Sequence, residues 1–227
     1  MSETNKKYLL NNDDIIKIFN EKLEYMIERN FYWGEESKLI TSMKLSFKNK
    51  IMKNLNELMG NIDFSNNLFL IKNKSIDLLE HSMNTCLCSS IMSNFLKYSE
   101  EDLKIIMAGS LLHDIGKIMV PAEILNKNEG LTQKEWEEIK KHPVTSYQIL
   151  KSVDEYSSFA EAVLYHHERH DGTGYPEGIT GEDIPLLSKI ISVADAFEAM
   201  TSQRDYKPAK TTQEAAQELM RFSGTQF

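Results

Sequence analysis

Cysteine is scarce in this chain of 227 residues, which contains only Cys86 and Cys88. Two cysteines cannot form the disulfide framework that is typical of small secreted domains. They are separated by one residue within a helical pattern, which favours two packed free thiols over a soft metal site. This cysteine usage fits a reducing cytoplasm, where we expect the protein to reside.

Long apolar runs are also lacking. No run approaches the roughly 20 apolar residues that a membrane-spanning helix needs, and the polar N-terminus lacks the hydrophobic region of a signal peptide. We therefore expect no membrane span. Internal repeats, low-complexity segments and the alternating pattern of β-strands are absent as well. The hydrophobic share of 41% is enough for one sizeable core with a smaller companion domain.

Positive charge is in short supply in the second part of the chain. The formal net charge is −8; residues 1–75 carry 12 basic and 10 acidic residues, whereas residues 76–227 carry 14 basic and 24 acidic ones. An acidic surface repels nucleic-acid polymers, which we exclude as partners. If the substrate is a phosphate ester, bound cations must supply the local positive charge.

Apolar residues recur at helical spacing over residues 12–30 and 36–59, and residues 60–67 are expected to form a loop. Helix then follows helix to the C-terminus, which predicts an all-α fold. We expect a small helical N-terminal domain over residues 1–70 and a second domain over residues 71–227. The N-terminal region is interpreted as sensory, as dimerising, or as packing against the second domain, and the sequence does not choose among these.

One stretch, Ser110 to Lys117, places His113 and Asp114 side by side after an apolar helix that begins with a capping box at Ser99. Gly116 is a natural end for that helix. Imidazole nitrogen and carboxylate oxygen are ligands for Zn, Mn or Fe. Asp114 has two oxygens, so it can bridge two metal ions.

The remaining histidines support this interpretation. Five of the six lie at or near a helix end or share a helix face with a carboxylate, and they are His81, His113, His142, His166 and His167. The acids Asp77, Asp114 and Asp195 add oxygen ligands. Such a set without thiolate suits Fe, Mn or Zn in a site of two or three ions, which can activate water and hold a phosphoryl group. His170 is expected to be a surface loop residue.

These motifs together resemble the HD phosphohydrolase superfamily and, within it, the HD-GYP subfamily. The resemblance rests on His113-Asp-Ile-Gly-Lys117, Lys141-His142-Pro143, His166-His-Glu-Arg169, Asp171-Gly-Thr-Gly-Tyr-Pro176 and Val193-Ala-Asp195. It implies an HD-domain helical bundle over residues 71–227. The implied activity is hydrolysis of the bacterial second messenger cyclic di-GMP to linear pGpG and, in some members, to GMP.

The resemblance also implies residue roles. The implied metal ligands are His81, His113, Asp114, His142, His166, His167 and Asp195, with Asp77 as a candidate ligand for a third ion. Asp114 and Lys117 would be catalytic, and Gly174, Tyr175, Arg204 and Lys207 would bind substrate. The implied cofactor is two divalent transition-metal ions, Fe or Mn before others, with a third left open because Asp77 is shorter than the family's glutamate.

This chain departs from the family pattern in three further places. Asn84-Thr85 stands where Arg-Val is usual, Asp205 replaces a proline, and the chain stops at Phe227 where the family continues, so we expect a C-terminally truncated domain. Two alternatives stay open: hydrolysis of another cyclic dinucleotide or a nucleotide, and a catalytically silent module that binds cyclic di-GMP or docks partners. Also open are a homodimer and docking of GGDEF or other signalling proteins through the Gly-Tyr-Pro loop.

Overall fold

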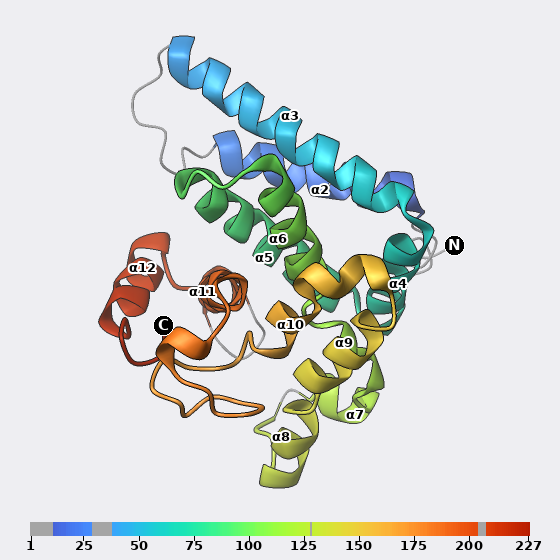
Figure 1. Cartoon of the computed structure of the whole chain (residues 1–227), viewed down its shortest axis with the longest axis vertical. Helices are drawn as coiled ribbons and strands as arrows, with labels where there is room; N and C mark the ends of the chain where they lie inside the picture. The colour runs from blue at the N-terminus through green and yellow to red at the C-terminus, as the bar shows by residue number, and fades with distance from the viewer. Residues whose placement is uncertain (1–10, 29–37, 128, 204–207) are drawn as a thin grey trace.

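The computed structural model describes residues 11–28, 38–127, 129–203 and 208–227. The regular elements of these residues are all helical, and strands are absent from them, which confirms the all-α prediction (Figure 1). In chain order they are α2 (Asn12–Glu28), α3 (Lys38–Gly60), α4 (Ile62–Lys74), α5 (Ile76–Phe95), α6 (Glu100–Leu112), η2 (Ile115–Met119), α7 (Ala122–Leu125), α8 (Gln133–Ile139), α9 (His142–Leu150), η3 (Asp154–Tyr156), α10 (Ser157–Leu164), η4 (Gly181–Asp183), α11 (Leu186–Thr201) and α12 (Thr212–Arg221).

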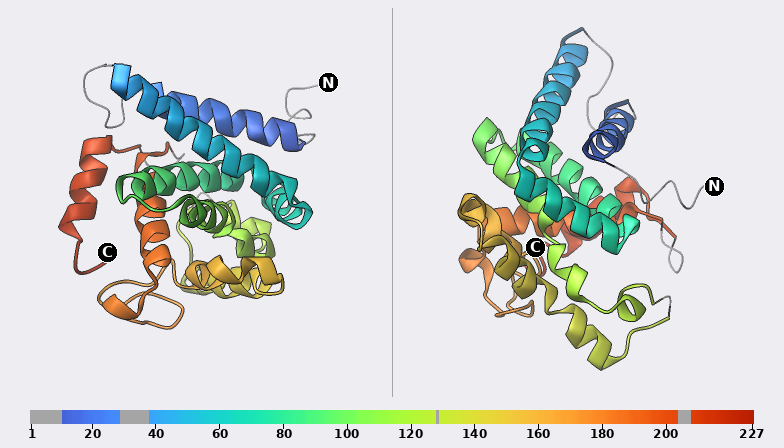
Figure 2. Two further views of the ribbon diagram at one scale, coloured as in Figure 1. Left: turned by 45° about the horizontal axis from the view of Figure 1, so that its top comes forward. Right: turned by 90° about the vertical axis from the view of Figure 1, so that its right-hand side faces the viewer.

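Helices α2 and α3 lie together along one side of the molecule, as both views of Figure 2 show. Ile15, Phe19 and Leu23 recur every fourth residue along α2, so they share one face, and each is fully buried. The prediction of a loop over residues 60–67 is wrong, because most of these residues belong to α4. Asn61 is instead the N-cap of that helix, and its side chain accepts a 2.9 Å hydrogen bond from Phe64 N.

Small side chains line the contact between α5 and α6. Ser89 Oγ and Ser110 Oγ lie 2.7 Å apart in the buried contact. The capping box predicted at Ser99 is present, with Asp102 as its acidic member. The close approach of these two helices brings the start of α5 near the C-terminal end of α6, where His113 follows.

The segment before His142 is not one continuous helix, although the capping-box pattern Thr132-Gln-Lys-Glu135 predicts a helix that reaches His142-Pro143. The capping box of Thr132 and Glu135 is present, but the helix it begins, α8, ends at Ile139 and does not reach His142. The chain turns and starts α9 at His142, with Pro143 in its first turn. Proline suits this position because the first amide groups of a helix have no partner within it.

The long loop between α10 and α11 lies beside the C-terminus (Figure 1). His170 N donates to Gln226 O at 3.2 Å, and Asp171 N donates to Thr225 O at 2.8 Å. These bonds fix the first part of the loop, so its Gly-Tyr-Pro segment extends from an anchored base.

One continuous hydrophobic core runs from Ile15 of α2 to Val163 of α10. The expected boundary between residues 70 and 71 falls inside α4. A separate N-terminal domain, and its role, therefore stay predictions. Within the described residues, no helix combines the length and apolar character needed to cross a bilayer.

Candidate metal centre

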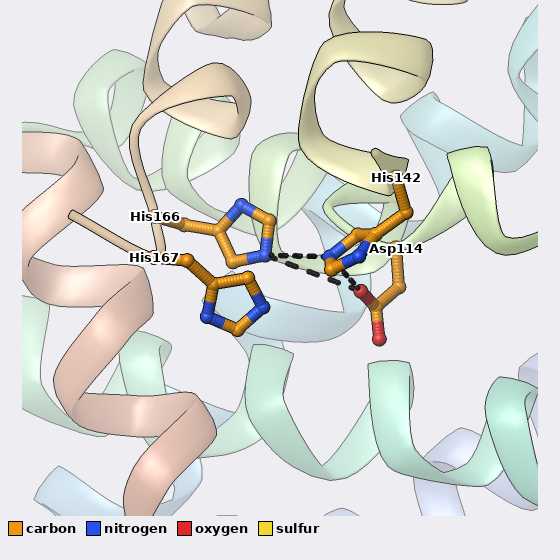
Figure 3. A group of neighbouring side chains, drawn as sticks. All are labelled: Asp114, His142, His166 and His167. Atoms are coloured by element: carbon orange, nitrogen blue, oxygen red, sulfur yellow. Dashed lines mark hydrogen bonds and ion pairs between the residues drawn. The ribbon is translucent and has the colours of Figure 1, made fainter. Parts of the chain in front are cut away.

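Five of the predicted ligands, all histidines, surround one buried carboxylate, that of Asp114. Their ligand atoms form two groups, each within 4.8 Å, and Asp114 belongs to both. The first group contains Asp114, His142, His166 and His167, and the second contains His81, His113 and Asp114. Figure 3 shows the three imidazoles of the first group turned toward Asp114. A carboxylate shared by two ligand groups is the arrangement that a bridged pair of metal ions requires.

The ends of three helices set the tautomers of three histidines. Nδ1 of His113 donates to Ser110 O at 2.8 Å, Nδ1 of His142 to Ile139 O at 2.8 Å, and Nδ1 of His166 to Val163 O at 2.5 Å. Each accepting carbonyl lies in the last turn of α6, α8 or α10, where carbonyl groups have no helical partner. Because a carbonyl can only accept, Nδ1 carries the proton and Nε2 presents a lone pair.

These lone pairs face other acceptors. His142 Nε2 lies 3.4 Å from His166 Nε2 and 3.1 Å from Asp114 Oδ1. Among the described residues, His113 Nε2 and Asp114 Oδ1 are buried without a hydrogen-bond partner. Converging buried acceptors repel one another and are costly to desolvate. A divalent cation among them removes both penalties, so the donor atoms fit a metal.

Asp195 lies beside the second group, next to His81. His81 Nε2 lies 3.1 Å from Asp195 Oδ1 and 3.5 Å from Asp114 Oδ2, and His113 Nε2 lies 3.4 Å from Asp114 Oδ2. On its other side, His81 Nδ1 lies 2.6 Å from Glu198 Oε2. Sequence reasoning missed Glu198, although it follows Asp195 by three residues and so shares its helix face.

Burial and neighbouring charges lower the pKa values of four members of the cluster. Burial lowers the pKa of His113, lowers that of His166 well below its usual range, and lowers that of His167 to about 3. Burial opposes the charged form of Asp114, but Lys117 and the imidazoles outweigh it and hold its pKa well below the usual range. Neutral imidazoles beside an ionised carboxylate are the protonation states that bind metals.

His81 behaves differently from the other imidazoles. Burial alone would lower its pKa, but hydrogen bonds to Asp195 and Glu198 outweigh burial and raise it to about 10. Asp114, Asp195 and Glu198 thus create a strongly negative field at His81. The same field attracts a metal cation.

Gly116 brings η2 against the start of α9. The expectation that Gly116 ends a helix is wrong, because α6 already ends at Leu112 and Gly116 lies within η2. A Cβ at this position would lie 2.2 Å from His142 O, and Gly116 N donates to Ser146 Oγ at 2.8 Å. Glycine is therefore needed for close approach, and this approach holds His142 beside Asp114.

Lys117 forms an ion pair with Asp114 Oδ2. It also lines a cleft of about 880 Å³ together with His81 and Asp195. The predicted catalytic pair is thus brought together at the edge of an opening to the ligand cluster.

The loop after α10 places an aromatic ring over the cluster. The ring of Tyr175 lies 4.8 Å from that of His167 and 6.3 Å from that of Trp136. A Cβ at Gly174 would lie 2.4 Å from Arg169 N, so the loop can approach the end of α10 only with glycine there. Glu168, which is buried, accepts from the amides of Glu177 and Gly178 at 2.7 and 2.9 Å and holds the loop's far side.

The other predicted residues are less closely involved. Asp77 is exposed on the wall of the same cleft and, within the described chain, belongs to neither ligand group. His170 is exposed, as predicted, and both cysteines are free thiols, as predicted. Arg204 and Lys207 lie outside the described residues, so their predicted binding roles stay predictions.

Comparison with known families matches residues 58–227 to the HD domain. This chain belongs to the HD domain family. The match confirms the resemblance seen in the sequence, and it begins within α3, ahead of the expected domain boundary.

Curated relatives of this HD domain chain include two named phosphodiesterases. The cyclic di-GMP phosphodiesterase response regulator RpfG of Xanthomonas campestris pv. campestris is 40% identical over 141 residues, which cover 61% of this chain and 37% of RpfG. The 3′3′-cGAMP-specific phosphodiesterase 3 of Vibrio cholerae is 36% identical over 129 residues, which cover 57% of this chain and 28% of the relative. The chain thus spans about a third of the length of these curated relatives.

Among solved structures, Bd1817, an HDG"Y"P protein of Bdellovibrio bacteriovorus, aligns with a TM-score of 0.58 at 19% identity. The alignment covers 95% of this chain and 67% of Bd1817. At this identity the likeness concerns the fold alone, and it agrees with the HD domain assignment.

Proposed function

We propose that this HD domain is a metal-dependent phosphodiesterase that hydrolyses cyclic di-GMP. The observation that carries the proposal is the Asp114 carboxylate, which is shared by two groups of metal-ligand atoms. The curated relatives that are named cyclic di-GMP phosphodiesterases support the same activity.

The residues of the first group would hold one divalent ion and those of the second group, with Asp195, the other. When bound, such ions lower the pKa of a water from about 16 toward roughly 7 and stabilise phosphate charge. The nitrogen and oxygen donors favour Fe or Mn, and Zn also accepts them. Asp77 stays a candidate ligand for a third ion.

Hydrolysis adds water across one phosphodiester bond. The water oxygen bonds to phosphorus, the bond from phosphorus to the 3′ oxygen breaks, and that oxygen takes up a proton, which gives linear pGpG. Lys117 lies where an ammonium group can hold a phosphate oxygen or protonate the leaving oxygen. A second round on pGpG would yield GMP.

The cleft suits a nucleotide of this size. Its volume of about 880 Å³ is at the upper end of the roughly 300–1,000 Å³ range of ligand pockets. Tyr175 offers an aromatic face beside His167, and Gly174 allows the close loop approach that places it there. Arg204 and Lys207 complete the proposed substrate contacts by analogy with the family motif.

A second candidate substrate is 3′3′-cGAMP, because the Vibrio cholerae relative is named as specific for it. Both substrates present the same phosphodiester ring and differ in one purine. A catalytically silent binding module is disfavoured, because every predicted ligand in the described chain is present and six of them converge.

We also propose a cytoplasmic location and a homodimer. The Gly-Tyr-Pro loop is the proposed docking surface for GGDEF or other signalling proteins.

The test is a turnover assay on the metal-reconstituted chain with each dinucleotide separately. We expect pGpG from cyclic di-GMP, inhibition by chelators, and loss of turnover in His142→Ala. His170→Ala is the matched control, because it removes the exposed sixth histidine, and it should retain turnover. Faster hydrolysis of 3′3′-cGAMP would transfer the proposal to that substrate. Tight binding of either dinucleotide without turnover by the metal-loaded chain would contradict an enzymatic function.

A further inference from the structure

Glu198 is a buried carboxylate that the sequence motifs do not assign to the site. It lies on α11, one helical turn after Asp195, and it is 4% exposed. Its Oε2 lies 2.6 Å from His81 Nδ1 on α5. An acid that is buried against one predicted ligand, on the side away from the other ligands, calls for a specific role.

Two further side chains hold Glu198 in place. Asn84 Nδ2 donates to its Oε1 at 3.1 Å, and Ser202 Oγ donates to the same oxygen at 2.6 Å. Asn84 lies three residues after His81, so one face of α5 supplies both the imidazole and the restraint on its partner. Both carboxylate oxygens are thus used, one for His81 and one for the restraints.

An ionised carboxylate only accepts hydrogen bonds, so His81 Nδ1 must donate to Glu198. With Nδ1 committed to Glu198, the tautomer that binds a metal ion presents Nε2, which faces Asp195 Oδ1 at 3.1 Å and Asp114 Oδ2 at 3.5 Å. His113, His142 and His166 obtain the same tautomer from helix-end carbonyls. His81 lies in the middle of a helix, where the carbonyls are already bonded, and therefore needs a side-chain acceptor.

We propose that Glu198 is a positioning residue that fixes the tautomer and orientation of His81 for metal binding. The inference rests on the proposed metal centre and concerns one half of it. Without this carboxylate the His81 proton is free to occupy Nε2, and the ring is free to rotate. Outer partners of metal-ligating histidines typically contribute about 10- to 100-fold to metal affinity.

The experiment titrates metal-free protein with Mn²⁺ and measures both the number of bound ions and their dissociation constants. The variants are Glu198→Gln, whose amide oxygen still accepts a hydrogen bond, and Glu198→Ala, which removes the acceptor. Glu161→Gln is the control, because it removes one exposed carboxylate from α10. Thermal unfolding of the metal-free forms provides a second readout that is independent of activity.

We expect two ions in the parent and in Glu161→Gln. In Glu198→Ala one ion should be weakened by about 10- to 100-fold and the other should be unchanged, whereas Glu198→Gln should recover part of the loss. Two equally tight ions in both Glu198 variants would overturn the inference while leaving the proposed function intact. Fewer than two ions in the parent would instead contradict the proposed metal centre.

If Glu198→Ala does not fold, Glu198→Gln provides the test. Its metal-free form should melt at a temperature close to that of the parent, but Mn²⁺ should stabilise it less than it stabilises the parent. Equal stabilisation of the two proteins by Mn²⁺ would overturn the inference.

Discussion

At the scale of single residues, the site depends on which nitrogen of each histidine carries a proton. Three imidazoles donate from Nδ1 to carbonyls three residues earlier, and His81 donates to Glu198. Every Nε2 of these four residues is left as the nitrogen that can bind a metal ion, and it is aimed at the Asp114 or Asp195 carboxylates or at another imidazole. Such a group of acceptors is favourable only around cations.

Asp114→Asn should abolish turnover and lower metal content. The amide keeps the size of the side chain but loses the charge that both ligand groups share, and its NH₂ places a donor where a second ligand oxygen is needed. We expect a loss of turnover greater than about 100-fold, since loss of an outer partner alone costs about 10- to 100-fold. Turnover and metal content should be measured on the same preparation. Turnover within about tenfold of the parent would show that the bridging role is wrong.

Asp77→Ala should leave two ions bound and most of the activity. Asp77 is exposed on the cleft wall and lies outside both ligand groups of the described residues. An aspartate is also one methylene shorter than a glutamate, whereas metal–oxygen distances tolerate only about 0.2 Å of error. Asp77→Glu is the companion variant, and elemental analysis of both is the measurement. Loss of a tightly bound ion from Asp77→Ala would establish Asp77 as a direct ligand.

At the scale of elements, helix ends build the centre. His113 follows α6, His142 begins α9 just after α8, and His166 follows α10. The sequence indicated these positions, because capping boxes and apolar periodicity locate helix starts and ends. It did not show that free carbonyls would set the tautomers, since that depends on backbone geometry in the last turn.

Gly116→Ala should weaken the half of the centre that contains His142. The new Cβ would lie 2.2 Å from His142 O, so η2 and the start of α9 must separate. Gly130→Ala is the control, because a Cβ there would have no neighbour within 4 Å. We expect Mn²⁺ titration to show one weakened ion in Gly116→Ala and two unchanged ions in Gly130→Ala. Unchanged affinity in Gly116→Ala would mean that this contact does not position His142.

At the scale of the whole molecule, distant segments meet at the centre. Asp195 on α11 and His81 on α5 are brought together because these helices pack side by side. The sequence motifs predicted that these residues share a site, and the all-α class followed from periodicity. Glu198 was missed because its role is visible only when α5 and α11 are adjacent. The prediction of a loop at residues 60–67 was wrong because asparagine is common both in loops and at helix N-caps, and Asn61 is an N-cap.

The continuous core also bears on the N-terminal helices. Buried residues of α2 and α3 belong to the same cluster as those of α5, α6 and α10. Direct packing therefore connects the N-terminal helices to α5, which carries His81, and to α6, which precedes His113.

The central claim is that Asp114 bridges two metal ions, and an anomalous-scattering map of crystals grown with Mn²⁺ tests it most directly. We predict two peaks, separated by about 3.5–4 Å, on opposite sides of the Asp114 carboxylate. One peak should contact His142, His166 and His167, and the other His81, His113 and Asp195. A single peak, or two peaks that do not share Asp114, would contradict the account.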